Sequence, residues 1–576
     1  MQSPKFRVLV SAAALALLAS CGGGGSGSGP GVGSGAGNSS GPGGYGNGIA
    51  GTPADMPSIP QASRMLGQAT FGATTADMDR LTAGGYTAWI EDQFAKPQAL
   101  HRNYIDSITA SLGTKATQNH FQESFWQQAI TGEDQLRQRM AFALSQIFVV
   151  SVLDSTVNSY PRGVASYYDT LATHAFGNFR DLLEAVALHP MMGIYLTSMR
   201  NQKETGTRVP DENFAREVMQ LLTIGLNELN ADGSPKMIDN QPVETYTSAD
   251  ISGLAKVFTG WSWAGADKGD SRFYGGNADP NRDWLPMQSY PKFHSTSEKR
   301  FLGVTVPAGA TPEASLKIAL DTLFNHPNVG PFIGRQLIQR LVTSNPSPHY
   351  IGRVASAFAN NGQGMRGDMK AVIRAILLDP EARSDAVLAD PRGGKLREPV
   401  LRLANWMRAF GAKSTSGRFL MSSSLDDPLT SLGQTPMRSP SVFNFYRPGY
   451  VPPNTAIAAA GLVSPEMQIT GETSVVGYLN FMRDVIANGT GNTRDVKPDY
   501  GIELTLADTP EKLVDHVNLL LMANQMPASL RGRIVNAVSS VPVSATNAAT
   551  AATARRNRVY LAVFLTMASP EYLVQK

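Results

Sequence analysis

The chain has 576 residues, of which 42% are hydrophobic and 17% charged, and it contains a single cysteine. One cysteine excludes an internal disulfide and a cysteine-rich zinc site. The formal net charge of +3 at pH 7 excludes a strongly basic chain, so we predict no nucleic-acid partner.

Residues 1–20 have the pattern of a signal peptide. Lys5 and Arg7 precede an apolar run over 8–19, which is too short to span a hydrocarbon core of ~30 Å. The run ends in Leu18-Ala19-Ser20-Cys21, which resembles the bacterial lipobox. This resemblance implies lipidation of Cys21, with the lipid bilayer as a partner. The alternative is an ordinary secretory signal followed by a chance cysteine.

Residues 21–59 are predicted to be the lipidated cysteine and a flexible tether. Sixteen of the 55 glycines fall within 22–51, a stretch that carries no charge and cannot bury a core. Its mean reach is roughly 30 Å. Gly22 follows the cysteine, in place of the Asp that retains lipoproteins at the inner membrane. We therefore expect an exported protein, lipid-anchored in the outer membrane and facing the periplasm or the cell surface.

From residue 60 onward the pattern is typical of a mainly α-helical globular body with few short strands. Apolar residues recur at helical spacing, for example around Leu136, Leu182 and Leu320. A capping residue followed by Pro and Glu marks five helix starts. These five motifs begin at Thr311, Asp379, Ser464, Thr509 and Ser569.

Two long irregular excursions interrupt the helical pattern. One is rich in Gly, Asp and aromatic residues, with a short hairpin expected around 300–306, and the other is rich in Ser and Pro. Long ordered loops in a compact domain are commonly functional. The predicted parts are an N-terminal helical part (60–261), the aromatic excursion (262–310), a central helical part (311–411), the Pro/Ser-rich excursion (412–460) and a C-terminal helical part (461–576).

Motifs that include Arg64–Gly72, Asp211–Glu217 and Tyr246–Asp250 are spread along the body. Together they resemble a bacterial family known as domain of unknown function 1800. The resemblance covers roughly residues 60–576 and implies no established activity. Its genes often neighbour those of a secreted sulfatase-like family, which implies an exported sulfatase-like protein as a partner. Ser295 stands where family members often have Asp, directly after the motif histidine. The matching segments are Arg64–Gly72, Asp211–Glu217, Leu222–Gly225, Tyr246–Asp250, Phe258–Trp261, Phe293–His294 with Lys299, Leu302–Gly303, His326–Pro327, Gly367–Asp368 and Leu432–Pro436.

The motif at 211–225 supplies the first candidate site residues. Wound as a helix, it places Asn213, Arg216, Glu217 and Gln220 on one polar stripe. Such a stripe is suited either to a substrate-facing wall or to a buried polar network that fixes the helix. The second interpretation is the more common of the two.

Two further motif residues, Asp250 and His294, complete a candidate catalytic set with Asn213, Arg216 and Glu217. Imidazole and carboxylate groups are suited to acid–base chemistry. Adding His326 to Glu217, Asp250 and His294 would allow a metal site, but no metal-binding spacing supports one, so none is assigned.

Aromatic residues near the first excursion supply candidate substrate contacts. Trp261 and Trp263 could stack on sugar rings or simply anchor the loop, and Lys299 belongs to the neighbouring motif. No nucleophile-elbow or P-loop pattern occurs in the body, and the cofactor is unknown.

These observations predict a membrane-anchored helical lipoprotein that binds or assembles with another exported protein acting on cell-envelope or polymer material. The alternative is an enzyme of unrecognised type, hydrolase-like and with or without the help of a metal, with a polar cleft of His, Glu, Arg and Asn. The enzyme hypothesis requires its five catalytic candidates to share one pocket that solvent can reach.

Overall fold

A computed structural model describes residues 55–576 apart from residue 423. The predicted signal peptide, Cys21 and most of the tether lie outside the described residues. None of the described helices is long and apolar enough to cross a membrane.

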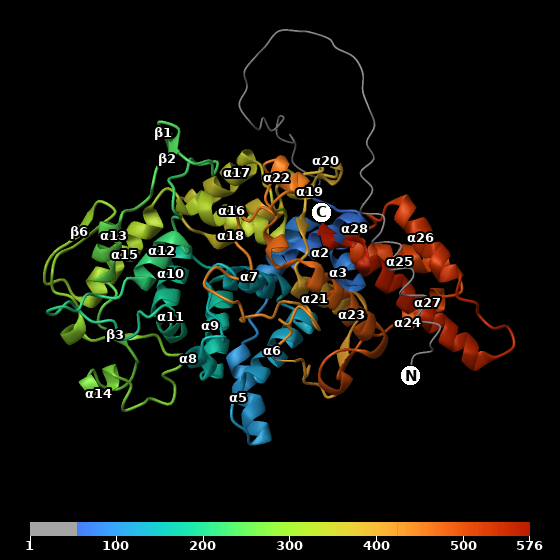
Figure 1. Ribbon diagram of the computed structural model, residues 1–576, viewed down its shortest axis with the longest axis horizontal. Coiled ribbons are helices and arrows are strands. Elements are labelled where there is room, and N and C mark those ends of the chain that lie inside the picture. Colours follow the sequence, from blue (N-terminus) through green and yellow to red (C-terminus); the bar gives the residue numbers. More distant parts are fainter. Residues whose placement is uncertain (1–54, 423) are drawn as a thin grey trace, which may run out of the picture.

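The described part is mainly α-helical, as predicted, and it is elongated along one axis (Figure 1). Its N-terminal helices are α2 (Ile59–Ala69), α3 (Thr75–Gly84), α4 (Tyr86–Ala95), α5 (His101–Leu112), α6 (Gln118–Thr131), α7 (Gln135–Ser145), α8 (Ser155–Asn158), α9 (Pro161–His174), α10 (Phe179–Leu188), α11 (Pro190–Tyr195), α12 (Asn213–Gln220) and α13 (Ser248–Ala255). The central helices are α14 (Asp270–Phe273), α15 (Pro312–Asn325), α16 (Val329–Leu341), α17 (Pro348–Ala359), α18 (Met369–Leu377), α19 (Pro380–Arg383), α20 (Ala386–Ala389) and α21 (Pro399–Ala409).

Of the C-terminal helices, α24 to α27 form one end of the molecule in Figure 1, and α13 and α15 lie toward the other end. The C-terminal helices are α22 (Ala456–Ala459), α23 (Glu472–Asn488), α24 (Gly501–Leu506), α25 (Pro510–Met522), α26 (Ala528–Ser539), α27 (Ala548–Ala568) and α28 (Pro570–Leu573). Three short 3-10 helices are η1 (Pro291–Phe293), η2 (Pro465–Ile469) and η3 (Asn492–Arg494).

The strands of the described residues form short antiparallel pairs. The predicted hairpin around 300–306 is present as one of them. The pairs are β1 (Met237–Ile238) with β2 (Gln241–Pro242), β3 (Trp261–Ser262) with β4 (Gln288–Ser289), β5 (Lys299–Phe301) with β6 (Val304–Val306), β7 (Lys395–Leu396) with β10 (Val574–Gln575), and β8 (Lys413–Ser414) with β9 (Val496–Lys497).

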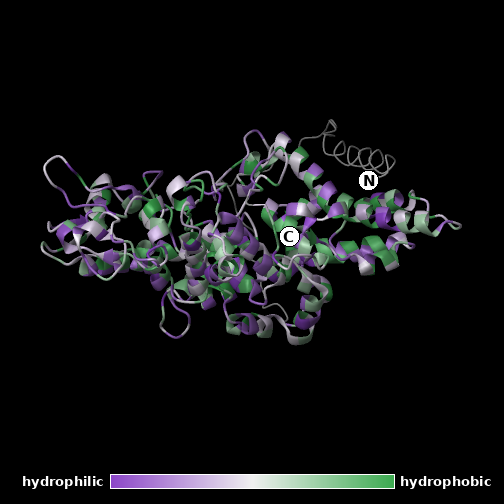
Figure 2. Ribbon diagram, turned by 90° about the horizontal axis from the view of Figure 1, so that it is seen from below, coloured by the Kyte–Doolittle hydropathy of each residue, from purple (hydrophilic) through white to green (hydrophobic). Residues whose placement is uncertain are grey.

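One cluster of contacting buried hydrophobic residues extends from Ala62 to Tyr572. The helices carry both hydrophobic and hydrophilic residues, as expected where one face packs on a core (Figure 2). The predicted helical parts therefore pack on a shared core, and the two excursions lie against it.

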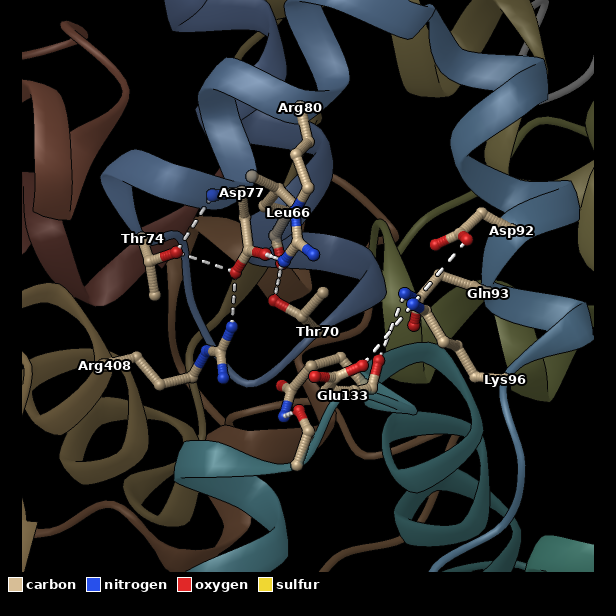
Figure 3. A network of polar contacts seen from close by, with 12 residues as sticks. Leu66, Thr70, Thr74, Asp77, Arg80, Asp92, Gln93, Lys96, Glu133 and Arg408 are labelled. Atoms are coloured by element: carbon tan, nitrogen blue, oxygen red, sulfur yellow. Dashed lines mark hydrogen bonds and ion pairs between the residues drawn. The ribbon is translucent and has the colours of Figure 1, made fainter.

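A buried ion pair joins the N-terminal helices to α21 (Figure 3). The Arg408 guanidinium donates to an Asp77 carboxylate oxygen at 2.6 Å and to the carbonyl oxygens of Gly72 and Ile130 at 2.7 and 2.8 Å. Gly72 has a φ of +143°, and a Cβ there would lie 2.7 Å from the Asn405 Cα. The glycine that ends the first family motif is thus needed for the close approach of α21.

Candidate functional site

Helix α12 is shorter than the helix predicted over 211–225, because it ends at Gln220. Asn213 and Arg216 lie on its exposed face. The Asn213 side chain donates to the Thr197 hydroxyl at 3.4 Å, and Arg216 pairs with Glu212 at 3.4 Å. Exposed pairs of this kind contribute at most about 1 kcal/mol.

Glu217 differs from the rest of the predicted stripe because its side chain is buried, only 7% exposed. Its Oε2 has no hydrogen-bond partner in the protein. Burial raises the pKa of Glu217, and the nearby Arg216 offsets only part of that rise.

Asp250 and His294 both hold backbone in place. Asp250 accepts hydrogen bonds from the backbone amide and hydroxyl of Thr247, each at 2.7 Å, in a capping box at the start of α13. Its other oxygen accepts from the Leu302 amide at 2.7 Å, which fastens the β5–β6 turn to this helix. The buried His294 ring bonds to the Thr259 carbonyl at 2.8 Å and the Ser315 hydroxyl at 3.2 Å, and burial lowers its pKa.

The structure places the five catalytic candidates in neighbouring elements. Among the described residues, no side-chain hydrogen bond or ion pair joins one of the five to another. The described part also holds no group of three or more His, Cys, Asp or Glu side chains arranged to bind a metal ion.

Of the three predicted substrate contacts, Trp261 lines an open groove of about 530 Å³ with charged residues such as Lys268, Glu313 and Lys317. Its indole nitrogen is buried and has no partner in the protein. Trp263 instead packs under the Arg282 guanidinium, whose central carbon lies 4.5 Å from the centroid of the Trp263 ring.

Lys299 is fully buried, and its ammonium donates to the Ser297 carbonyl at 3.3 Å. Burial lowers the pKa of Lys299, against the attraction of Glu204. The Glu204 carboxylate also accepts from the Ser295 hydroxyl at 2.9 Å, so the serine that replaces the family's Asp takes part in this cluster.

A larger cavity, of about 650 Å³, lies between α16, the end of α12 and the second excursion. This volume falls within the usual range for small-molecule sites. One face of α16 forms a wall of the cavity. The α16 residues of this wall, spaced by one or two helical turns, are Phe332, Arg335, Gln336, Gln339 and Arg340. The remaining walls come from Gln146, Ile147, Gln220, Leu221, Gly225, Leu226, Asn227, Leu229, Val442, Phe443, Arg447, Pro448, Gly449 and Val463.

The shape of this cavity depends on Gly225. Its φ is +74°, and a Cβ at this position would lie 2.7 Å from the Phe332 ring. Glycine therefore lets the chain leave α12 and turn closely over α16.

Four buried side chains that line the cavity retain polar atoms with no hydrogen-bond partner in the protein. They are Oε1 of Gln146, Nε2 of Gln336, Oε1 of Gln339, and both Nε and Nη1 of Arg340. A buried polar group left without a partner costs about 1–3 kcal/mol. Their position around one cavity makes it the candidate binding site.

A buried charge cluster lies behind the cavity. The Glu398 carboxylate accepts from Gln146 at 2.6 Å, Gln434 at 2.7 Å and Tyr446 at 2.9 Å. Burial acts to raise the pKa of Glu398, but the charges of Lys395, Arg139 and Arg340 together with the Gln434 hydrogen bond lower that pKa overall. The carboxylate is therefore held in its ionised form.

Sequence reasoning missed this cavity. The usable signals were the polar residues at helical spacing in an otherwise apolar segment, 329–341, and the Pro-rich part of the second excursion, which lines the opening. The segments that meet at the cavity lie up to 317 residues apart, from 146 to 463, so no local spacing reveals it.

A family model described as "Protein of unknown function (DUF1800)" matches residues 64–574. No curated protein and no solved structure matches the chain. Because the match spans most of the chain, from the motif that ends at Gly72 to the strand that pairs with β7, the protein belongs to the DUF1800 family.

Proposed function

We propose that this protein is an exported, lipid-anchored binding protein whose helical body holds a small molecule in the cavity beside α16. The observation that carries the proposal is the set of four buried side chains, Gln146, Gln336, Gln339 and Arg340, whose unpartnered atoms line that cavity. A ligand that supplied their hydrogen bonds would recover several penalties of about 1–3 kcal/mol each.

The N-terminal sequence supports the location in this proposal. The lipobox-like segment ending in Cys21 would attach the chain to a bilayer, and the glycine-rich segment would hold the body away from it. The body would then work next to another exported protein, and the family resemblance favours a sulfatase-like partner acting on envelope or polymer material.

The test is the identity of what the protein retains. The full-length protein is purified from its native membranes, denatured, and analysed by mass spectrometry for released small molecules. We expect a stoichiometric compound from the wild type and loss of that compound from Gly449→Leu, because a Cβ at Gly449 meets no atom within 4 Å and a longer side chain would occupy the cavity.

Gly532→Leu serves as the matched control, since Gly532 is an exposed glycine on α26 with equally open surroundings. The proposal fails if no compound is released from either protein, or if the same compound stays bound after Gly449→Leu.

The partner is tested separately by chemical cross-linking in intact cells, followed by purification of the lipoprotein. Recovery of an exported sulfatase-like protein at comparable abundance is the expected result. A purified complex that contains only this chain would contradict the assembly part of the proposal.

A second candidate function, catalysis, is favoured by one observation. Glu217 is buried, has an unpartnered carboxylate oxygen and a raised pKa, and lies one helical turn before Gln220 of the cavity wall. If the retained compound is turned over, Glu217→Gln should abolish turnover while the compound stays bound. Unchanged turnover in this variant would exclude Glu217 as an acid or base.

A further inference from the structure

We infer that the ligand of the α16 cavity is an anionic amphiphile, with a carboxylate or phosphate head at Arg340 and an apolar body extending toward Phe332. The inference rests on the proposed binding function and specifies the chemistry of the ligand.

The first argument is the charge of the lining. The described residues that line the cavity include Arg335, Arg340 and Arg447 and no carboxylate. Of these, Arg340 is only 1% exposed, and two of its three guanidinium nitrogens have no partner in the protein. Hydrogen bonds from a guanidinium to an anion are roughly twice as strong as neutral ones.

The second argument is the charge balance of the buried cluster behind the lining. Three buried cations, Arg139, Arg340 and Lys395, face two buried carboxylates, Glu398 and Glu466. Lys395 pairs with Glu466 at 3.0 Å, and Glu398 takes its three hydrogen bonds from neutral groups.

This set therefore has one positive charge in excess. Arg402, also buried, adds a further cation near Glu466. Buried charge without compensation is costly, and an anionic group bound at Arg340 would supply the missing negative charge.

The third argument is the polarity gradient along the cavity. Arg340 and Phe332 are eight residues apart on α16, which corresponds to about 12 Å of helix rise. Gln146 and Gln339 lie toward the Arg340 end, since Gln146 bonds to Glu398 and Gln339 is the neighbour of Arg340.

Three apolar side chains line the other end of the cavity, beside the polar Asn227. Phe332 lies against Gly225, and Leu226 and Leu229 follow in the same segment of the lining. Leu226 is 56% exposed and therefore offers apolar surface to a group bound in the cavity. One end of the cavity thus suits an anionic head and the other an apolar body.

A charge series of probes tests this inference on the full-length protein. Octanoate, octyl phosphate, octanol and octyltrimethylammonium share one chain and differ in the head group. Titration calorimetry in a fixed detergent, with detergent-only blanks, measures each affinity. We expect at least one anion to bind about 10- to 100-fold more tightly than octanol, the range for a hydrogen bond to a charged group, and the cation not to bind.

The two anionic probes distinguish the head groups. Tighter binding of octanoate indicates a carboxylate ligand, and tighter binding of octyl phosphate indicates a phosphate ligand. Arg340→Gln should remove the preference for anions over octanol, and Arg340→Lys should restore part of this preference. Arg556→Gln, at an exposed arginine of α27, is the control.

The outcomes separate this inference from the proposed function. If octanol binds as tightly as both anions, the anionic head is excluded, while a small-molecule site remains. If no probe binds and the native preparation releases no compound, both fail. Should Arg340→Gln not fold, the head-group preference of the wild type and its loss in Gly449→Leu decide the question.

Discussion

Arg408 and Arg340 are both buried arginines on helices, yet their surroundings differ. All three guanidinium nitrogens of Arg408 donate to protein acceptors, whereas two nitrogens of Arg340 have none. A fully paired buried cation fits a structural role, because all of its donors are satisfied within the protein. A buried cation with free donors at a cavity is a candidate binding group.

The Arg408 pair should be critical for stability. Arg408→Ala would leave Asp77 buried without its principal partner and is expected to lower the free energy of unfolding by about 3–5 kcal/mol. Arg80→Ala is the matched control, since Arg80 pairs with the same carboxylate but its side chain is 60% exposed. This substitution should lower the free energy of unfolding by less than ~1 kcal/mol. Urea unfolding measures both, and equal losses would contradict the structural role of Arg408.

His189 should make stability depend on pH. Burial lowers the pKa of His189 to about 3, so the unfolded chain takes up a proton near pH 6.5 and the folded chain does not. The contribution of His189 to the free energy of unfolding is complete above about pH 6.5. It falls by about 1.4 kcal/mol per pH unit as the pH decreases toward 3.

In the wild type, the His189 Nδ1 accepts a hydrogen bond from the Met191 amide at 3.2 Å. His189→Asn removes the titrating group and keeps a side-chain acceptor for this amide. The difference in unfolding free energy between variant and wild type, measured from pH 8 to pH 4, should shift in favour of the variant as pH falls. A constant difference would show that His189 does not titrate as a buried group.

At the scale of single elements, local sequence predicted much of the fold. All five motifs of a capping residue, Pro and Glu begin a helix, four of them α-helices and one the 3-10 helix η2. The motifs act within one turn, so their outcome depends little on tertiary contacts. The 211–225 helix was predicted too long because the tight turn at Gly225 depends on packing against Phe332.

The same motifs differ in how the cap is made. The Thr311 hydroxyl accepts from the Ala314 amide at 3.2 Å, while Thr509 makes no side-chain cap hydrogen bond. Thr311→Ala should therefore lower the free energy of unfolding by about 1 kcal/mol, and Thr509→Ala should lower it by distinctly less. Chemical unfolding of the two variants checks this, and a larger loss for Thr509→Ala would contradict it.

At the scale of the whole molecule, local sequence predicts the helices but not the cavity or the contacts of the candidate site residues. Glu217, Asp250 and His294 were selected for their chemistry, but tertiary contacts determine that Asp250 caps a helix and His294 bonds to Thr259. The cavity depends on residues as distant as Gln146 and Val463, which only the complete fold brings together.

The proposed attachment through Cys21 also concerns the whole molecule. Cys21→Ser should release the body from the membrane fraction and abolish incorporation of labelled palmitate, because no other cysteine can take the thioether. Ser26→Ala, within the same tether, should leave both unchanged. Membrane fractionation measures the release, and a Cys21→Ser protein that stays membrane-bound would refute lipid anchoring.

Two contacts of helix α2 join segments that lie far apart in the chain. The Ser63 hydroxyl donates to the Leu519 carbonyl at 3.0 Å, and the Arg64 side chain reaches Asp385 at 3.2 Å. These contacts span 456 and 321 residues. A chain that emerges from its N-terminus first, from a ribosome or a translocation channel, can pack α2 against α3 and α7 early. It completes these two contacts only after Asp385 and α25 have emerged, so the last part of the chain closes the packing around α2.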